Sequence, residues 1–208
     1  KNSHNLSEPE ISLSLRQVAK LPAFYFLVAA ISLSSVVGPA LNLHMIPYFT
    51  DKGLDPAIAV LTTTILFITG AIGSLVFGFL AERFSIRQIL STNYLMLGLG
   101  MAGLLLVDST PKAFTWAIYM GLVQGGGFTL NQVLFADYFG RDSLGAIRGV
   151  ISPIQLGANA IGPLAAAYAY DVLGNYFAIF LIFGLLRLIS GALVLFAKQP
   201  TKSTFIRE

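Results

Sequence analysis

Residues 78–87 read GFLAERFSIR, a short charged segment between two long apolar runs. The run 56–81, which ends just before Glu82, has no charged residue, and neither does the run 88–107, which begins just after Arg87. A membrane helix needs about 20 apolar residues at 1.5 Å per residue, and each run is long enough. We therefore interpret this segment, called here the Glu82 loop, as the connection between two membrane-spanning helices.

The composition of the whole chain agrees with this interpretation. Its 208 residues are 55% hydrophobic and only 11% charged, with a mean hydropathy of +0.75, whereas soluble domains carry roughly 25% charged residues. The sequence pI is about 9.2, but the basic residues lie between apolar segments, so nucleic acid is not an expected partner. The chain has no cysteine, and we expect neither a metal nor a cofactor.

The chain is predicted to be an all-α integral membrane protein with three parts. A lead-in segment covers 1–20, a six-helix transmembrane bundle covers 21–197, and a tail covers 198–208. The lipid bilayer is the expected surrounding of the bundle. Six apolar segments are long enough to span it: 21–49, 56–81, 86–107, 112–138, 144–170 and 176–197.

The basic residues predict the orientation of these six spans. With alternating loops, ten lysines and arginines fall on one side and two, Lys52 and Lys112, on the other. Because cytoplasmic loops carry the excess of basic residues, both termini and the Glu82 loop are expected in the cytoplasm of a multi-pass protein of the plasma (inner) membrane. The ten are Lys1, Arg16, Lys20, Arg83, Arg87, Arg141, Arg148, Lys198, Lys202 and Arg207.

The sequence around the Glu82 loop recurs 89 residues later. Small residues from Gly73 to Gly78 precede Glu82, and small residues from Gly162 onward precede Asp171. Each copy ends the second helix of three, so two copies of three helices have opposite orientations in the membrane. We therefore predict a 3+3 inverted repeat, a feature of secondary transporters. Small residues spaced for close helix contact are Gly70, Gly73, Gly78, Gly121, Gly125, Ala158, Gly162 and Ala166.

The Glu82 loop resembles a motif of the major facilitator superfamily. That family has Gly-x-x-x-Asp-Arg-x-Gly-Arg-Arg/Lys between the second and third helices of each six-helix half. Gly78, Glu82, Arg83 and Arg87 match it, with Glu for Asp, and Ser85 replaces the second glycine.

Other segments resemble the C-terminal half of the same family. They are 13–24 (the approach to the seventh helix), 136–140 (the end of the tenth) and 162–176 (the eleventh and its turn into the twelfth). The lead-in and 44–54 are most similar to the monocarboxylate-porter and oxalate–formate-antiporter branch. The resemblance implies one half of a secondary transporter whose partner is an N-terminal six-helix half.

The branch implies a small organic anion, a mono- or dicarboxylate, carried by alternating access as an antiporter. Carboxylate carriers of the branch commonly have a basic residue in the eighth helix, and the oxalate antiporter has a lysine in the eleventh. Here 56–81 has no basic residue, and Gln155 lies near the position of that lysine. A sugar, an amino acid or a drug therefore stays open as the substrate.

Polar residues inside the spans are the candidates for contact with a small-molecule substrate. His44 is expected to bind an anion or carry a proton, with Tyr48 and Asn42 nearby, or else to be hydrogen-bonded near the external mouth. An arginine such as Arg187 in the middle of a membrane span has a high free-energy cost of insertion. Its guanidinium can bind a carboxylate through two parallel N–H donors, or it can form a structural ion pair.

The fourth and fifth spans supply the remaining candidates. Gln124 and Asn131 lie on the fourth, and Gln155 and Asn159, four residues apart on one helix face, lie on the fifth. In the family, the corresponding tenth and eleventh helices line the cavity. Hydrogen bonding between helices is the alternative role for these amides.

The Glu82 loop is predicted to be a conformational latch formed by Gly78, Glu82, Arg83 and Arg87. An acid at a helix C-terminus is disfavoured by the dipole and needs another partner. Arg83, Arg87 or a helix of the opposite half can serve. The alternative is that the arginines only set the topology.

Two other classes of protein can also have six membrane spans. An intramembrane enzyme needs facing catalytic groups, and the sequence has no His-Glu-x-x-His, no Gly-x-Ser-Gly and no acid pair within spans; we expect no enzyme. A non-transporting six-helix scaffold or a dimeric channel stays open.

Overall fold

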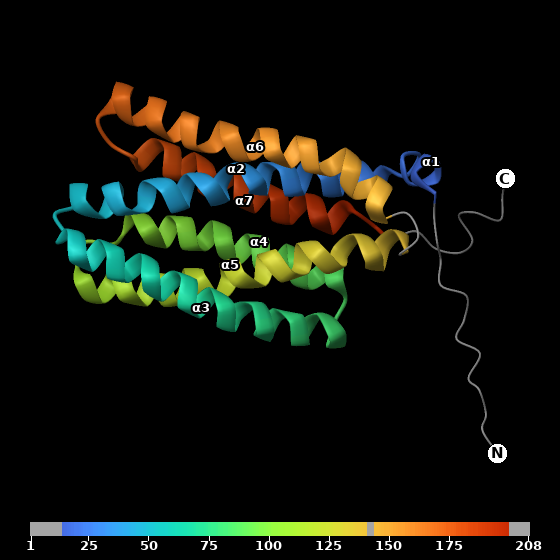
Figure 1. Ribbon diagram of the computed structural model, residues 1–208, viewed down its shortest axis with the longest axis horizontal. Helices are drawn as coiled ribbons and strands as arrows, with labels where there is room; N and C mark the ends of the chain where they lie inside the picture. Colours follow the sequence, from blue (N-terminus) through green and yellow to red (C-terminus); the bar gives the residue numbers. More distant parts are fainter. Residues whose placement is uncertain (1–13, 141–143, 200–208) are drawn as a thin grey trace, which may run out of the picture.

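A computed structural model describes residues 14–140 and 144–199, so most of the lead-in and of the tail lies outside the described residues. A single turn, α1 (Leu15–Val18), precedes six long helices that run antiparallel to their chain neighbours (Figure 1). The long helices are α2 (Pro22–Asp51), α3 (Pro56–Arg83), α4 (Ile86–Leu105), α5 (Thr110–Phe139), α6 (Leu144–Leu173) and α7 (Phe177–Phe196). All six predicted spans are confirmed as helices.

Local sequence signals place the helix ends. The Asp55 carboxylate accepts the Ala57 N–H at 2.7 Å and so caps α3, and prolines occupy the first turns of α2, α3 and α5. Gly140 ends α5 with φ of 82°, a left-handed conformation that glycine adopts without strain. The described connections between long helices, 52–55, 84–85, 106–109 and 174–176, are short, which keeps neighbouring helices antiparallel.

The helices have the length and composition of a multi-pass membrane protein. Five of them, all the long ones except α5, are long and apolar enough to cross a membrane. The exception, α5, has 30 residues and lies inside the same bundle. Its polarity comes from residues such as Gln124, Asn131 and Gln132, of which Gln124 and Asn131 are site candidates.

The packing of the helices has an internal symmetry. α3 packs on α5 as α6 packs on α2, α4 packs on α5 as α7 packs on α2, and α4 and α7 pack on each other. Figure 1 shows the result as two groups of three, α6–α2–α7 and α3–α5–α4. Exchanging the first three long helices with the last three reproduces every one of these contacts. The 3+3 repeat is therefore present. The first helix of each copy packs with the second and third helices of the other copy: α2 with α6 and α7, and α5 with α3 and α4.

The recurring glycines lie at equivalent contacts of this symmetry. A Cβ on Gly73 of α3 would overlap the Leu122 carbonyl of α5, and one on Gly162 of α6 would overlap the Val36 carbonyl of α2. Gly73 and Gly162 are separated by the 89 residues of the sequence repeat. The repeat therefore marks two equivalent places where helix backbones approach closely, and Gly125, whose Cβ would overlap the Gly70 carbonyl, is another close contact between α3 and α5.

The bundle has two ends, which are named here by acidic residues. The Glu82 end is where α3, α5 and α7 finish, and the Asp51 end is where α2, α4 and α6 finish. The apolar core lies among α2, α4, α5 and α7, whereas α3 and α6 lie outside it and keep much of their apolar surface exposed. This exposed surface is available to lipid or to a further helical partner.

Candidate functional site

Asn42 of α2 and Gln124 of α5 meet at the middle of the bundle. Gln124 Nε2 donates to Asn42 Oδ1 at 3.3 Å, and Asn42 is exposed. Gln124 Oε1 is buried and has no hydrogen-bond partner among the described residues. Gln124 also lines a cavity of about 390 Å³ between α3 and α5. Because an unpaired buried acceptor costs ~1–3 kcal/mol, a solute group that donates a hydrogen bond to Gln124 Oε1 would be stabilised here.

Asn131 and Gln155 are brought together on a second cavity. It has a volume of about 150 Å³ and lies between α5 and α6, nearer the Glu82 end. The Tyr94 hydroxyl donates to Asn131 Oδ1 at 2.8 Å, and Asn131 Nδ2 donates to the Gly127 carbonyl at 2.8 Å. These two bonds fix the amide of Asn131. Asn159 lies four residues beyond Gln155, half-buried, toward the Asp51 end.

His44 is held by two partners near the Asp51 end. Its Nδ1 is 3.1 Å from the Tyr176 hydroxyl, and its Nε2 is 3.1 Å from the Pro163 carbonyl. The Tyr176 hydroxyl can donate to Nδ1 when that nitrogen carries no hydrogen. A carbonyl only accepts, so Nε2 carries the hydrogen. His44 therefore joins α2 to α6 and to the start of α7, as the structural alternative requires.

We expect His44→Ala to destabilise the Asp51 end without removing binding groups from the centre of the bundle. It leaves the Pro163 carbonyl and the Tyr176 hydroxyl without their partners, at ~1–3 kcal/mol. Unfolding in detergent measures the loss, with Leu43→Ala, an exposed neighbour, as the control. Unchanged stability together with lost proton-coupled transport would instead assign His44 a role in moving protons.

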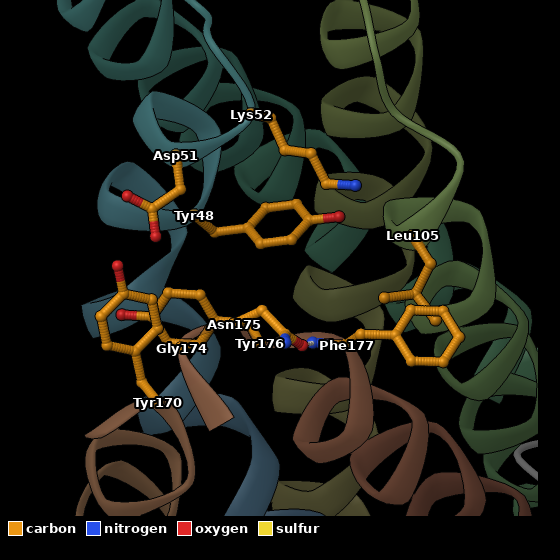
Figure 2. A pocket seen from close by; sticks show the side chains of 9 residues that line it. All are labelled: Tyr48, Asp51, Lys52, Leu105, Tyr170, Gly174, Asn175, Tyr176 and Phe177. Atoms are coloured by element: carbon orange, nitrogen blue, oxygen red, sulfur yellow. Dashed lines mark hydrogen bonds between the residues drawn. The ribbon is translucent and has the colours of Figure 1, made fainter. Parts of the chain in front are cut away.

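Tyr48 lies on an open cavity of about 760 Å³ at the Asp51 end (Figure 2). Its hydroxyl donates to the Leu104 carbonyl at 3.0 Å, which links α2 to α4. Lys52 Nζ lies 5.7 Å from the Tyr48 ring centroid, and Tyr170 points toward Asp51 in Figure 2. The cavity therefore carries one acid and one base at its mouth, and the Tyr48 hydroxyl is already used inside the bundle.

Arg187 is buried within the bundle, only 6% exposed. It donates through Nη1 to the Ser34 hydroxyl of α2, and its Nε is buried without a hydrogen-bond partner. No acid of the described residues forms an ion pair with it, which leaves the predicted structural ion pair without support. The Tyr94 hydroxyl is near enough to interact with its charge and donates in turn to Asn131. A polar chain thus connects Arg187 to the cavity between α5 and α6.

The Glu82 loop is exposed at the end of α3. The Arg83 guanidinium lies 4.2 Å from the Phe79 ring centroid, and Arg87 is half-buried at the start of α4. In the described part of the chain Glu82 forms no ion pair with either arginine. Gly78 packs beside Thr129 of α5. Neither local cation neutralises Glu82, so its carboxylate is free to meet another partner.

The sequence does not identify three polar residues near the site. Ser34 and Tyr94 belong to the polar chain between Arg187 and Asn131, and Arg148 lines the cavity between α5 and α6. Ser34 and Tyr94 lie in apolar spans and have nothing unusual around them in the sequence. The sequence interpretation gives Arg148 only the role of a charge that sets topology, although Ser152 and Gln155 follow it at the next turns of the same helix. This helical spacing of polar residues is the one signal in the sequence that identifies Arg148 as a candidate site residue.

Comparison with known proteins places this geometry in a family. The family model described as Major Facilitator Superfamily matches residues 11–208. The chain belongs to this superfamily. Its bundle also superposes on the crystal structure of the fucose:proton symporter of E. coli with a TM-score of 0.72, at 16% identity, over 89% of this chain and 45% of that one. The all-α membrane fold predicted from the sequence is confirmed.

Within the superfamily, the chain is similar to monocarboxylate transporters. It is 28% identical over 159 residues to monocarboxylate transporter 12-B of Danio rerio, covering 74% of this chain and 33% of that protein. It is 28% identical over 163 residues to monocarboxylate transporter 12 of Homo sapiens, covering 76% and 31%. The chain thus spans about a third of the length of these relatives. The predicted likeness to the monocarboxylate-porter branch is confirmed.

Proposed function

We propose that this superfamily member is the C-terminal half of a secondary transporter that carries a small organic anion by alternating access. The observation that carries the proposal is the sign of the charge inside the spans. Among the described residues, every Asp and Glu lies in a loop or within the last turn of a helix, whereas Arg187 is buried in α7 without an acidic partner. An uncompensated positive interior attracts an anion. The names of the relatives support the same substrate class.

An N-terminal six-helix half is the proposed partner, and it covers the face where α2, α5, α3 and α6 are exposed. Both termini and the Glu82 end face the cytoplasm of the plasma membrane in this proposal, as the basic residues predict. Glu82 then meets a helix of the partner half on the cytoplasmic side. Gly78, which packs beside Thr129 of α5, Arg83 and Arg87 complete the latch.

The substrate lies against α2, α5 and α6. Asn42 and Gln124 contact it at the centre, and Asn131, Gln155 and Asn159 contact it nearer the Glu82 end. His44 and Tyr48 support the opposite end, where their polar atoms already bind other helices. Arg187 acts at a distance, through Tyr94 and Asn131.

The test compares a carboxylate with its neutral amide. Proteoliposomes containing both halves are expected to take up a radiolabelled small monocarboxylate and to exclude the amide of the same shape, because only the anion gains from the positive interior. Uptake is expected to rise when the vesicles are preloaded with unlabelled anion at equal pH on both sides, which indicates exchange.

Equal uptake of the amide would contradict an anion carrier. Uptake of a sugar alone would support a second candidate, a neutral polyhydroxyl solute, which the unpaired Oε1 of Gln124 favours because hydroxyl groups donate to it. Strict dependence on a pH gradient would contradict exchange. The chain purified alone is expected to be inactive, since six helices cannot enclose the cavity.

A further inference from the structure

The cavity between α5 and α6 is lined mainly by polar side chains, and one of them is the cationic side chain of an arginine. Asn131 and Gln132 line it from α5, and Arg148, Ser152 and Gln155 line it from α6. Of the described residues that line it, Arg148 alone is charged. At ~30 Å³ per molecule of liquid water, its volume of about 150 Å³ equals about five waters. A carboxylate on a short carbon chain matches that size.

The spacing along α6 places the polar groups in one row. Residues 148, 152, 155 and 159 follow steps of four, three and four, so Arg148, Ser152, Gln155 and Asn159 share a helix face. Arg148 lies about one turn inside the start of α6 at Leu144, and Gln155 lies ~10 Å further along at 1.5 Å per residue. The row therefore runs from the Glu82 end toward the centre of the bundle.

The guanidinium of Arg148 retains most of its binding capacity. Nη2 donates to the Gln132 carbonyl at 3.1 Å, and no acid in the described ranges forms an ion pair with this arginine. A guanidinium has five N–H donors in a fixed fork, so most of them remain for a ligand. The bond to Gln132 also directs the side chain across the gap toward α5. A positioned arginine with free paired donors suits a carboxylate.

We infer that Arg148 is the residue that binds the substrate carboxylate when the carrier is open at the Glu82 end. This inference rests on the proposed function. The amides of Asn131 and Gln155 bind the rest of the small anion, and Tyr94 keeps Asn131 in position for it. Arg187 does not take this role, because it is buried among α2, α4 and α7 and is not part of the lining.

The test is a side-specific measurement of KM in right-side-out and inside-out vesicles carrying both halves. Arg148→Gln is expected to raise KM for the carboxylate about tenfold or more at the Glu82 face, the effect of losing a charged hydrogen bond, and less than threefold at the Asp51 face. Arg148→Lys keeps the charge but loses the fork, so an intermediate increase is expected. Lys198→Gln removes a cation of the same end that is exposed, as Arg148 is, but does not line the cavity, and it is expected to leave both KM values unchanged.

The outcomes separate this inference from the proposed function. If the unmodified protein carries the carboxylate and Arg148→Gln behaves like Lys198→Gln, Arg148 is only a topogenic charge and the inference is wrong. An equal rise at both faces also contradicts a subsite that belongs to one face. If the unmodified protein carries no carboxylate, the proposed function itself fails, and the inference fails with it.

Discussion

Gly73→Val is expected to keep α3 from packing on α5, and Gly162→Val to keep α6 from packing on α2, each with a loss of at least ~3 kcal/mol of stability. At both positions a Cβ would overlap a backbone carbonyl of the facing helix, Leu122 or Val36. Overpacking typically costs ~1–3 kcal/mol when side chains can move, and a helix backbone cannot turn aside as a side chain does. The loss of stability is therefore expected at ~3 kcal/mol, the upper end of that range, or above it.

Gly157→Val is the matched control for this pair. Gly157 lies on α6, five residues before Gly162, and nothing lies within 4 Å of a Cβ placed there. Thermal unfolding in detergent should separate Gly157→Val, close to the unmodified protein, from the two contact variants. If Gly162→Val melts with the control, α2 and α6 do not pack as closely as they do in this structure.

The 89-residue repeat shows how far the sequence predicts the fold. It identifies Gly73 and Gly162 as equivalent, and both are close-contact positions. It does not reveal that α2 packs with α6 and α7 while α5 packs with α3 and α4. Hydropathy marks where a span begins and ends, but partner choice depends on which surfaces fit. A second signal of the symmetry is found only in space, where Gly98 and Gly184 face each other's carbonyls across α4 and α7.

The candidate site was predictable where a polar side chain interrupts an apolar span. Gln124, Asn131 and Gln155 stand out for that reason, and all three line cavities. Their partners could not be predicted, because a hydrogen bond such as that from Tyr94 to Asn131 depends on the lateral position of two helices. The same limit applies to His44, whose ring binds Tyr176 and Pro163, both more than 100 residues away.

Arg187→Met is expected to leave stability unchanged or raise it while lowering transport at least tenfold. An arginine in mid-span costs ~2.5–3.5 kcal/mol on insertion scales, and Arg187 keeps an unpaired Nε. Replacing a buried charge with an apolar side chain of similar length is often neutral or stabilising. The same change removes the positive charge beside Tyr94, and with it the field that draws an anion toward Asn131. Unfolding in detergent and carboxylate uptake, corrected for folded protein, measure the two effects.

Two control variants separate loss of charge from a disturbed core. Arg187→Lys keeps the charge and should retain more transport than Arg187→Met. Ser190→Ala removes a buried hydroxyl one turn along α7, which donates to the Leu186 carbonyl of its own helix, and should leave transport unchanged. A fall in both stability and transport in Arg187→Met would show that the guanidinium holds α7 to α2 through Ser34. Opposite changes indicate instead that the cost of burying Arg187 is tolerated because its charge acts on the transported anion.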